Sequence, residues 1–204
     1  GSPLDVLGGA LEVLRTPAIA GLPPLTSGLV GSVGWDFVYQ WEPTLPSKAP
    51  EELEVPELTL CLAVDLAVVD HIEGAVWLVA NAINVDGADT GVDEAWASAV
   101  ARLDAMQAAL AEPVPAHAAV LDPDAPEPAF TARSTPEEYA QNVRIGKEAI
   151  RDGEVFQVVL SQRLDLDCPA DPLDVYRVLR TINPSPYLYY FQLRDERGTD
   201  FAVV

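Results

Sequence analysis

The chain has 204 residues, of which 49% are hydrophobic and 22% charged, and its formal net charge is −20. This apolar content excludes a disordered chain, and no apolar run reaches the roughly 18 residues that a membrane helix needs. A chain so acidic repels phosphate backbones, so we expect neither nucleic acid nor a membrane as a partner. The first residues also lack the positively charged start of a signal peptide.

The cysteines and histidines do not form the pattern of a metal or catalytic site. Cys61 and Cys168 are too few for a disulfide scaffold, and their apolar surroundings predict buried, reduced thiols, as in the cytoplasm. His71 lies in a predicted turn and His117 in a proline-rich segment, so we expect both at the surface. No chemistry follows from these four residues, and we expect a cytoplasmic protein.

The first predicted elements are a helix and a glycine-rich strand. Leucines at helical spacing predict a helix over residues 3–15. Residues 28–36 read GLVGSVGWD, with glycines spaced in threes, which matches neither the dinucleotide fingerprint nor a Walker loop. These glycines predict a strand that another backbone approaches closely.

The next segment predicts a hairpin and a helix. The β-rich run 58–69 and the strand 76–82 flank a turn with Gly74, where a positive φ is expected. Residues 93–111 predict a helix. Its inward stripe is expected to hold Trp96, Val100, Leu103 and Leu110.

A proline-rich linker divides the chain. Six prolines lie between residues 113 and 136, where neither a helix nor a central strand could hold them. The charge changes at the same place, because residues 1–132 hold 20 acidic and 3 basic residues, whereas residues 133–204 hold 12 acidic and 9 basic residues. We therefore predict two domains, 1–125 and 133–204.

The second part alternates helices and strands. Ser134 and Glu137 have the spacing of a capping box for a helix to Arg151, with Tyr139, Val143 and Ile150 inward. We then expect a strand 155–167, a helix from Asp171 to Asn183, and strands 187–193 and 199–204 joined by a turn. Together the elements predict an α+β fold, with two layers of mixed, largely antiparallel sheets flanked by helices. The last strand stops inside an apolar run, so we expect a truncated chain.

Two motifs resemble a known enzyme family. Residues 153–163 read GEVFQVVLSQR, and residues 176–180 and 183–187 read YRVLR and NPSPY. In order and spacing these segments resemble G-D-I-F-Q-V-V-L-S-Q-R and Y-R-x-L-R-x-x-N-P-S-P-Y of anthranilate synthase component I, a chorismate-utilising enzyme. The glycine segment and Asn81-Ala82 are similar to earlier parts of that family.

The resemblance implies a partial chorismate-binding fold. Residues 1–125 would be the remainder of the N-terminal regulatory domain, and 133–204 the start of the chorismate-binding domain, truncated at its C-terminal end. The family's G-S-S-P-E motif would follow Val204, so its magnesium-binding glutamates and catalytic histidine would be absent here. We therefore expect no catalysis by this chain alone, and Mg²⁺ only in the full-length parent.

For that parent, the resemblance implies the reaction, the partner and the regulation. It would convert chorismate and ammonia to anthranilate and pyruvate in tryptophan biosynthesis, a carbon–oxygen lyase reaction. A glutamine amidotransferase subunit would supply the ammonia, and tryptophan would act as feedback inhibitor.

The resemblance also singles out four residues. Gln157 occupies the position where the water-using relatives carry a lysine as general base. A glutamine amide cannot act as a base, whereas neutral ammonia needs none, so Gln157 is expected beside the active site of an amine-adding enzyme. Pro186, Tyr187 and Leu188 match the segment that contacts inhibitory tryptophan, although the family usually has methionine in place of Leu188.

Two alternatives stay open. Aminodeoxychorismate synthase component I adds ammonia at another ring carbon, but its equivalent segments usually read Q-V-N-L and N-P-A-P-F. The chain could instead be a non-catalytic module that binds an effector or the amidotransferase.

Overall fold

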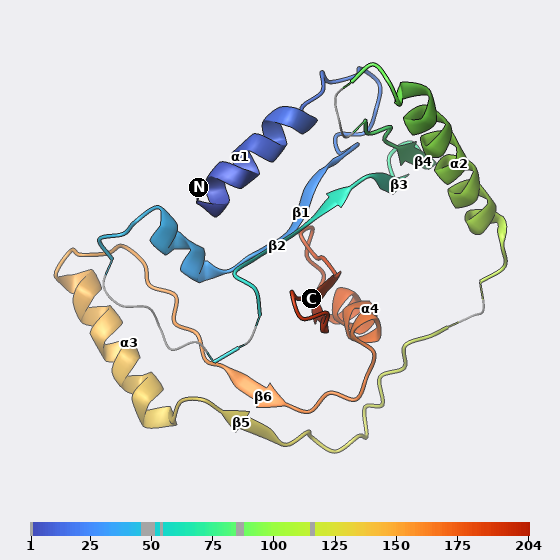
Figure 1. The fold of residues 1–204 in the computed structure, drawn as a ribbon. Helices are drawn as coiled ribbons and strands as arrows, with labels where there is room; N and C mark the ends of the chain where they lie inside the picture. The colour runs from blue at the N-terminus through green and yellow to red at the C-terminus, as the bar shows by residue number, and fades with distance from the viewer. Residues whose placement is uncertain (1, 46–51, 54, 85–87, 115–116) are drawn as a thin grey trace. The chain divides into compact units, whose positions relative to one another are not determined.

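The computed structural model describes residues 2–45, 52–53, 55–84, 88–114 and 117–204. The chain divides into two compact units, one formed by residues 1–117 with 191–203 and the other by residues 118–190 with Val204. Across the described residues the strands form antiparallel pairs, mixed with helices as predicted (Figure 1). The predicted domain limits 1–125 and 133–204 stay a prediction.

The first unit contains most of the strands. Its elements are α1 (Pro3–Leu14), β1 (Gly28–Val33), the 3₁₀ helix η1 (Trp35–Gln40), β2 (Leu58–Ala63), β3 (Asp65–Asp70), β4 (Ala75–Ala80), α2 (Val92–Ala111), β7 (Phe191–Arg194) and β8 (Asp200–Val203). The second unit contains β5 (Phe130–Ala132), α3 (Pro136–Arg151), β6 (Leu164–Leu166) and α4 (Pro172–Ile182).

The predicted run 58–69 is two strands with different partners, which corrects the single strand expected. β2 pairs with β1, and β3 pairs with β4 across a turn in which Gly74 has a φ of 65°, as predicted. The change of partner falls at Val64, whose carbonyl accepts hydrogen bonds from the backbone and the side chain of Asn81. This interaction with a residue 17 positions further along the chain interrupts an apolar run that looks continuous in the sequence.

The glycine prediction for β1 is confirmed. A Cβ atom on Gly31 would lie 2.0 Å from the carbonyl oxygen of Thr59 on β2, which is too close for any side chain. A Cβ atom on Gly34 would lie 3.2 Å from the carbonyl oxygen of Glu57. Glycine is therefore needed at position 31 because the β2 backbone occupies the space of a side chain.

Helix α2 has the predicted extent but buries a different face. Ala99 is buried, whereas Trp96 is 67% exposed and Leu110 61% exposed. The inward face consists of residues 95, 99, 102, 103 and 106. Of the four residues predicted to face inward, Leu103 lies on this face. α2 packs against β4, and its inward face combines Ala95 and Ala99 with larger side chains.

Helices α3 and α4 form where expected, with local corrections. The capping box of α3 uses Thr135 and Glu138, one residue later than predicted. Gly146 is buried and Ile150 exposed, so the inward face of α3 passes through Gly146, whose missing side chain leaves room for Val158. Asp171 caps α4 through the backbone N–H of Leu173.

Two predicted strands are shorter in the structure. Of 155–167 only β6 is a strand, and of 187–193 only its end, in β7, pairs with β8. Within the described residues, β5 is the partner of β6 and offers three positions. One more backbone hydrogen bond runs from Arg133 to the Arg163 carbonyl oxygen, and no described strand pairs with the residues before it. β5 itself lies inside the predicted linker, whose other described residues are irregular apart from the start of α3.

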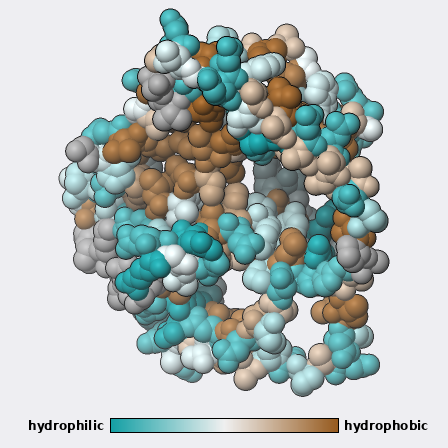
Figure 2. Space-filling model, turned by 45° about the vertical axis from the view of Figure 1, so that its right-hand side comes forward, coloured by the Kyte–Doolittle hydropathy of each residue, from teal (hydrophilic) through white to brown (hydrophobic). Residues whose placement is uncertain are grey.

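The buried core is small. Phe37, Ala99 and Leu193 are the hydrophobic residues buried among those described, and Phe37 packs edge-on against Trp41 at a ring distance of 5.2 Å. Many larger apolar side chains are exposed, and Figure 2 shows hydrophobic patches on one face. Both cysteines are exposed, which corrects the prediction of buried thiols. No described helix is both long and apolar enough to span a membrane.

Candidate functional site

Gln157 lies in the irregular segment between α3 and β6, and its side chain is exposed. The segment is held near its middle and near its end. Val158 lies beside Gly146 of α3, and the Gln162 side chain donates a hydrogen bond to the carbonyl oxygen of Ser134 at 3.3 Å. No described contact engages the Gln157 amide, so this side chain is open to approach.

Pro186 and Tyr187 form the turn that follows α4. Tyr187 is 86% exposed, Leu188 is half-buried, and the Tyr187 backbone N–H donates to the Ser185 hydroxyl at 3.2 Å. Behind the turn, Tyr176 of α4 stacks obliquely on Tyr190 at 6.2 Å. Within the described part of the chain, no hydrogen bond, ion pair or ring contact joins this turn to Gln157.

A carboxylate between two guanidinium groups lies at the β5–β6 pair. Arg133 Nε donates to Asp165 Oδ2 at 2.6 Å, and Arg163 Nε donates to Asp165 Oδ1 at 2.7 Å. The hydrogen bonds from Arg163 and then Arg133 lower the pKa of Asp165 below its usual value. Arg163 is the last residue of the GEVFQVVLSQR motif, so this cluster fixes one end of the segment that carries Gln157.

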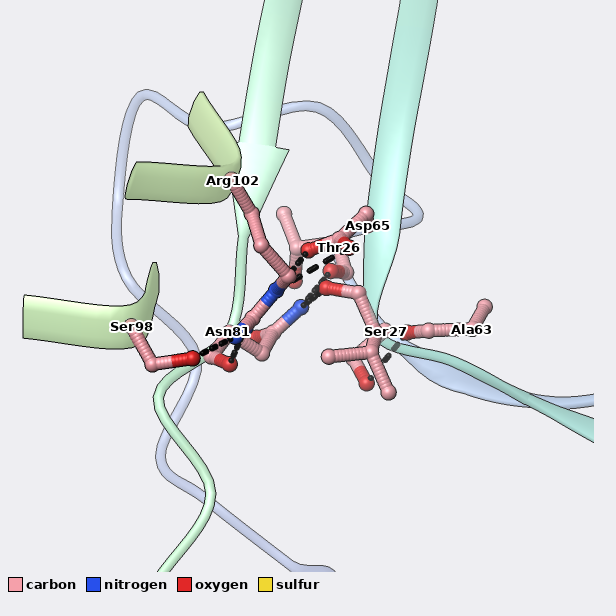
Figure 3. Close-up of polar contacts among 8 residues, drawn as sticks. Thr26, Ser27, Ala63, Asp65, Asn81, Ser98 and Arg102 are labelled. Carbon is pink, nitrogen blue, oxygen red and sulfur yellow. Dashed lines mark hydrogen bonds and ion pairs between the residues drawn. The ribbon is translucent and has the colours of Figure 1, made fainter. Parts of the chain in front are cut away.

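Asn81 is the centre of a polar network that sequence reasoning missed as a site. Its side-chain amide donates to the carbonyl oxygens of Thr26 at 2.9 Å and Val64 at 2.8 Å (Figure 3). Its own carbonyl accepts a hydrogen bond from Arg102 at 2.7 Å, and Arg102 also binds Asp65. Two features of the sequence could have indicated this network: the charged Asp65 inside an apolar run, and the amide side chain of Asn81 directly after β4.

Two surface grooves accompany these residues. One, in the first unit, has a volume of about 690 Å³ and includes Arg15 and Asn81 in its lining. The other, in the second unit, has a volume of about 410 Å³ and lies between residues 118–121 and the apolar side of α4. Across the described residues, no group of three or more His, Cys, Asp or Glu side chains could hold a metal ion.

His71 is exposed in the β3–β4 turn, as predicted, and His117 is also exposed. The Asp70 carboxylate accepts the backbone N–H groups of Ile72 and Glu73 and so shapes this turn. Neither histidine lies in the segments that carry Gln157 or Pro186.

Comparisons with known proteins give the chain a family. The model of the chorismate binding enzyme family matches residues 6–199. Anthranilate synthase component 1 of Arthrobacter globiformis is 48% identical over 100% of this chain and 39% of its own length, and that of Mycolicibacterium smegmatis is 48% identical over 100% and 38%.

A solved structure supports the same family. The crystal structure of anthranilate synthase component I from Streptococcus pneumoniae superposes with a TM-score of 0.66 at 26% identity, over 94% of this chain and 41% of that one. The chain thus spans about two fifths of the length of these relatives. Because the family model covers nearly the whole sequence and the fold agrees, the chain belongs to the chorismate binding enzyme family.

Proposed function

We propose that this chain is part of an anthranilate synthase component I. The observation that carries the proposal is its similarity along its full length to proteins of that name, at 46–48% identity in five of them. The whole protein converts chorismate and ammonia to anthranilate and pyruvate, a lyase reaction in tryptophan biosynthesis. The relatives' names favour this product over aminodeoxychorismate.

Gln157 supports the choice of ammonia as nucleophile. A primary amide has no basic lone pair at neutral pH, so it cannot deprotonate water. Neutral ammonia is already nucleophilic and requires only a position beside the ring, which an amide oxygen can provide by accepting an N–H hydrogen bond. The exposed Gln157 side chain is available for that role. We therefore assign Gln157 to the neighbourhood of the attacked ring carbon.

The remaining parts of the proposal concern the larger protein. A glutamine amidotransferase subunit delivers the ammonia, and the enzyme works in the cytoplasm. Magnesium is its cofactor, and among the described residues no group of three or more His, Cys, Asp or Glu side chains could hold the ion. We place the magnesium ligands in another part of the parent, and we expect this chain alone to form no anthranilate.

Tryptophan inhibits through the turn at Pro186, Tyr187 and Leu188. The turn directly follows α4 in the chain, so a ligand seated on it would lie beside the end of that helix. Inhibition requires that tryptophan bind two states of the enzyme with different affinity. The half-buried Leu188 and the exposed Tyr187 ring supply an apolar contact for the indole.

A chimera tests the proposed reaction. In the Mycolicibacterium smegmatis anthranilate synthase component 1, the matching 38% would be replaced by this chain and expressed in a strain lacking its own component 1. We expect growth without tryptophan and fluorescent anthranilate from chorismate, ammonia and magnesium. The unmodified host protein is the positive control. A soluble, folded chimera that makes 4-amino-4-deoxychorismate, or no aminated product, would contradict the proposal.

A further inference from the structure

The groove of about 690 Å³ in the first unit has the size of a small-molecule site. It lies where the end of α1 and the loop to β1 meet β2 and the end of β4. Apolar side chains supply much of its wall, among them Leu14, Ile19, Leu62 and Val79. Such a wall favours an apolar ligand body, because burying apolar surface contributes roughly 25 cal/mol per Å².

The charge of the lining is opposite to that of the chain. The protein carries 32 acidic residues, yet the described residues that line this groove include no Asp or Glu and one cation, Arg15. The groove therefore lacks the negative charge that dominates elsewhere. The nearby carboxylate of Asp65 is paired with Arg102, and charges more than about 10 Å away are largely screened at 0.1 M salt.

Arg15 is available for a ligand. It follows the last residue of α1 and its side chain is exposed. Six other arginines form ion pairs with carboxylates. Among the described residues, Arg15 forms no such ion pair. A guanidinium group binds a carboxylate through two parallel hydrogen bonds, so the favoured partner is a carboxylate from outside the chain.

The polar side of the groove is fixed in place. Asn81, which lines it, holds the carbonyl oxygens of Thr26 and Val64, and the Ser27 hydroxyl donates to the carbonyl oxygen of Ala63 at 3.0 Å (Figure 3). Arg102 secures the Asn81 carbonyl from α2. Groups already satisfied in this way do not need to rearrange, which lowers the cost of binding.

We propose that this groove binds an amphipathic monocarboxylate, with the apolar body on the leucine, isoleucine and valine side chains and the carboxylate on Arg15. An α-amino acid fits less well, because no carboxylate among the described lining residues could pair with its ammonium group. The lining of this groove does not include the turn at Pro186–Leu188, and the inference does not depend on the proposed function.

The test uses 3-phenylpropanoate as probe and the chain as it is, labelled with ¹⁵N. We expect saturable shifts of backbone amide signals at Thr16, Ile19 and Gly28, with a dissociation constant on the order of 1 mM. Arg15→Gln should weaken binding about tenfold, since a hydrogen bond to a charged group is worth that factor or more. Arg15→Lys should retain part of the affinity.

Three controls separate the charge from the groove. Arg180→Gln makes the same change of net charge on an exposed residue of α4 and should leave the affinity unchanged. The alcohol 3-phenylpropanol and the amino acid phenylalanine should each bind at least about fivefold more weakly than the acid. Equal binding by Arg15→Gln, shifts confined to the other unit, or no saturation by about 10 mM would overturn the assignment.

Discussion

Arg102 on α2 holds Asp65 on β3 with its Nε 3.0 Å from both carboxylate oxygens, and so joins two elements 37 residues apart in the chain. The same guanidinium reaches the Asn81 carbonyl and the Ser98 hydroxyl, each at 2.7 Å. Both side chains are about one third exposed. This contact fixes α2 beside the point where β2 and β3 change partners.

The Arg102–Asp65 pair should be measurable in a double-mutant cycle. Arg102→Gln should lower the free energy of unfolding by about 1–2 kcal/mol, because a half-buried carbonyl loses its donor as well. The coupling energy with Asp65→Asn should be about 0.5–1 kcal/mol, since the pair is partly screened by solvent. Arg151→Gln removes an exposed pair of 4.0 Å and should change little. Urea unfolding checks this, and strictly additive single effects would show that the contact does not couple.

Gly31→Ala should destabilise the β1–β2 pair strongly. Its Cβ would lie 2.0 Å from a backbone oxygen that cannot move without breaking the ladder, so we expect a loss of about 3 kcal/mol or more. Gly8→Ala is the matched control, because Gly8 lies inside α1 with open space around it. That variant should stabilise the helix by up to about 1 kcal/mol. Thermal unfolding of both variants gives the comparison, and a Gly31→Ala protein as stable as the parent would refute the close approach.

The Asp165 carboxyl group should titrate at lower pH than an ordinary aspartate. Hydrogen bonds from Arg163 and Arg133 lower its folded pKa, so this interaction stabilises the protein fully above the unfolded value of about 3.9. The stabilisation is lost as the pH falls through the folded pKa. Arg163→Gln should raise the pKa of Asp165, whereas Arg180→Gln should not. Carbon-detected NMR titration of the carboxyl group measures both, and an unchanged pKa in Arg163→Gln would exclude the cluster as the cause.

Gln157→Lys in the chimera should alter the choice of nucleophile. A lysine amine can act as general base toward water, so ammonia addition should fall and a hydroxylated product of the isochorismate type should appear. Gln141→Lys is the control, because it adds the same charge on the exposed face of α3, outside the segment that carries Gln157. This variant should retain amination. Product analysis by chromatography distinguishes them. Full amination by Gln157→Lys with no hydroxylated product would mean that residue 157 faces away from the ring.

Pro186→Ala in the chimera should weaken inhibition by tryptophan. Freeing the backbone of the turn should weaken the free energy of tryptophan binding by about 1 kcal/mol, which raises the inhibitory concentration of tryptophan about fivefold. Catalysis without tryptophan should be nearly unchanged. Pro172→Ala, in the first turn of α4, is the control for loss of a proline and should leave the inhibition constant as it is. Normal sensitivity in Pro186→Ala would exclude this turn from the effector site.

Local interactions made much of the fold predictable. The helices that begin near Pro3 and Asp171, the positive φ of Gly74 and the glycine at position 31 each follow from the chemistry of a few neighbouring residues, and the structure confirms them. The family resemblance also rested on short motifs, and the family comparison confirms it. The roles of Gln157 and Pro186 in the active and effector sites stay predictions.

Partner choice was decided only by tertiary structure. An apolar run of strand-forming residues does not say which strand it pairs with, and the division at Val64 depends on Asn81, 17 residues away. The inward face of α2 likewise depends on the space beside β4, which suits Ala99 and leaves Trp96 outside. Residues 155–162 have strand-forming side chains, but no described strand pairs with them. They stay irregular because a strand forms only when a second backbone supplies its hydrogen bonds. The sequence by itself determined the helices, turns and family, whereas long-range contacts determined how the strands pair and which faces are buried.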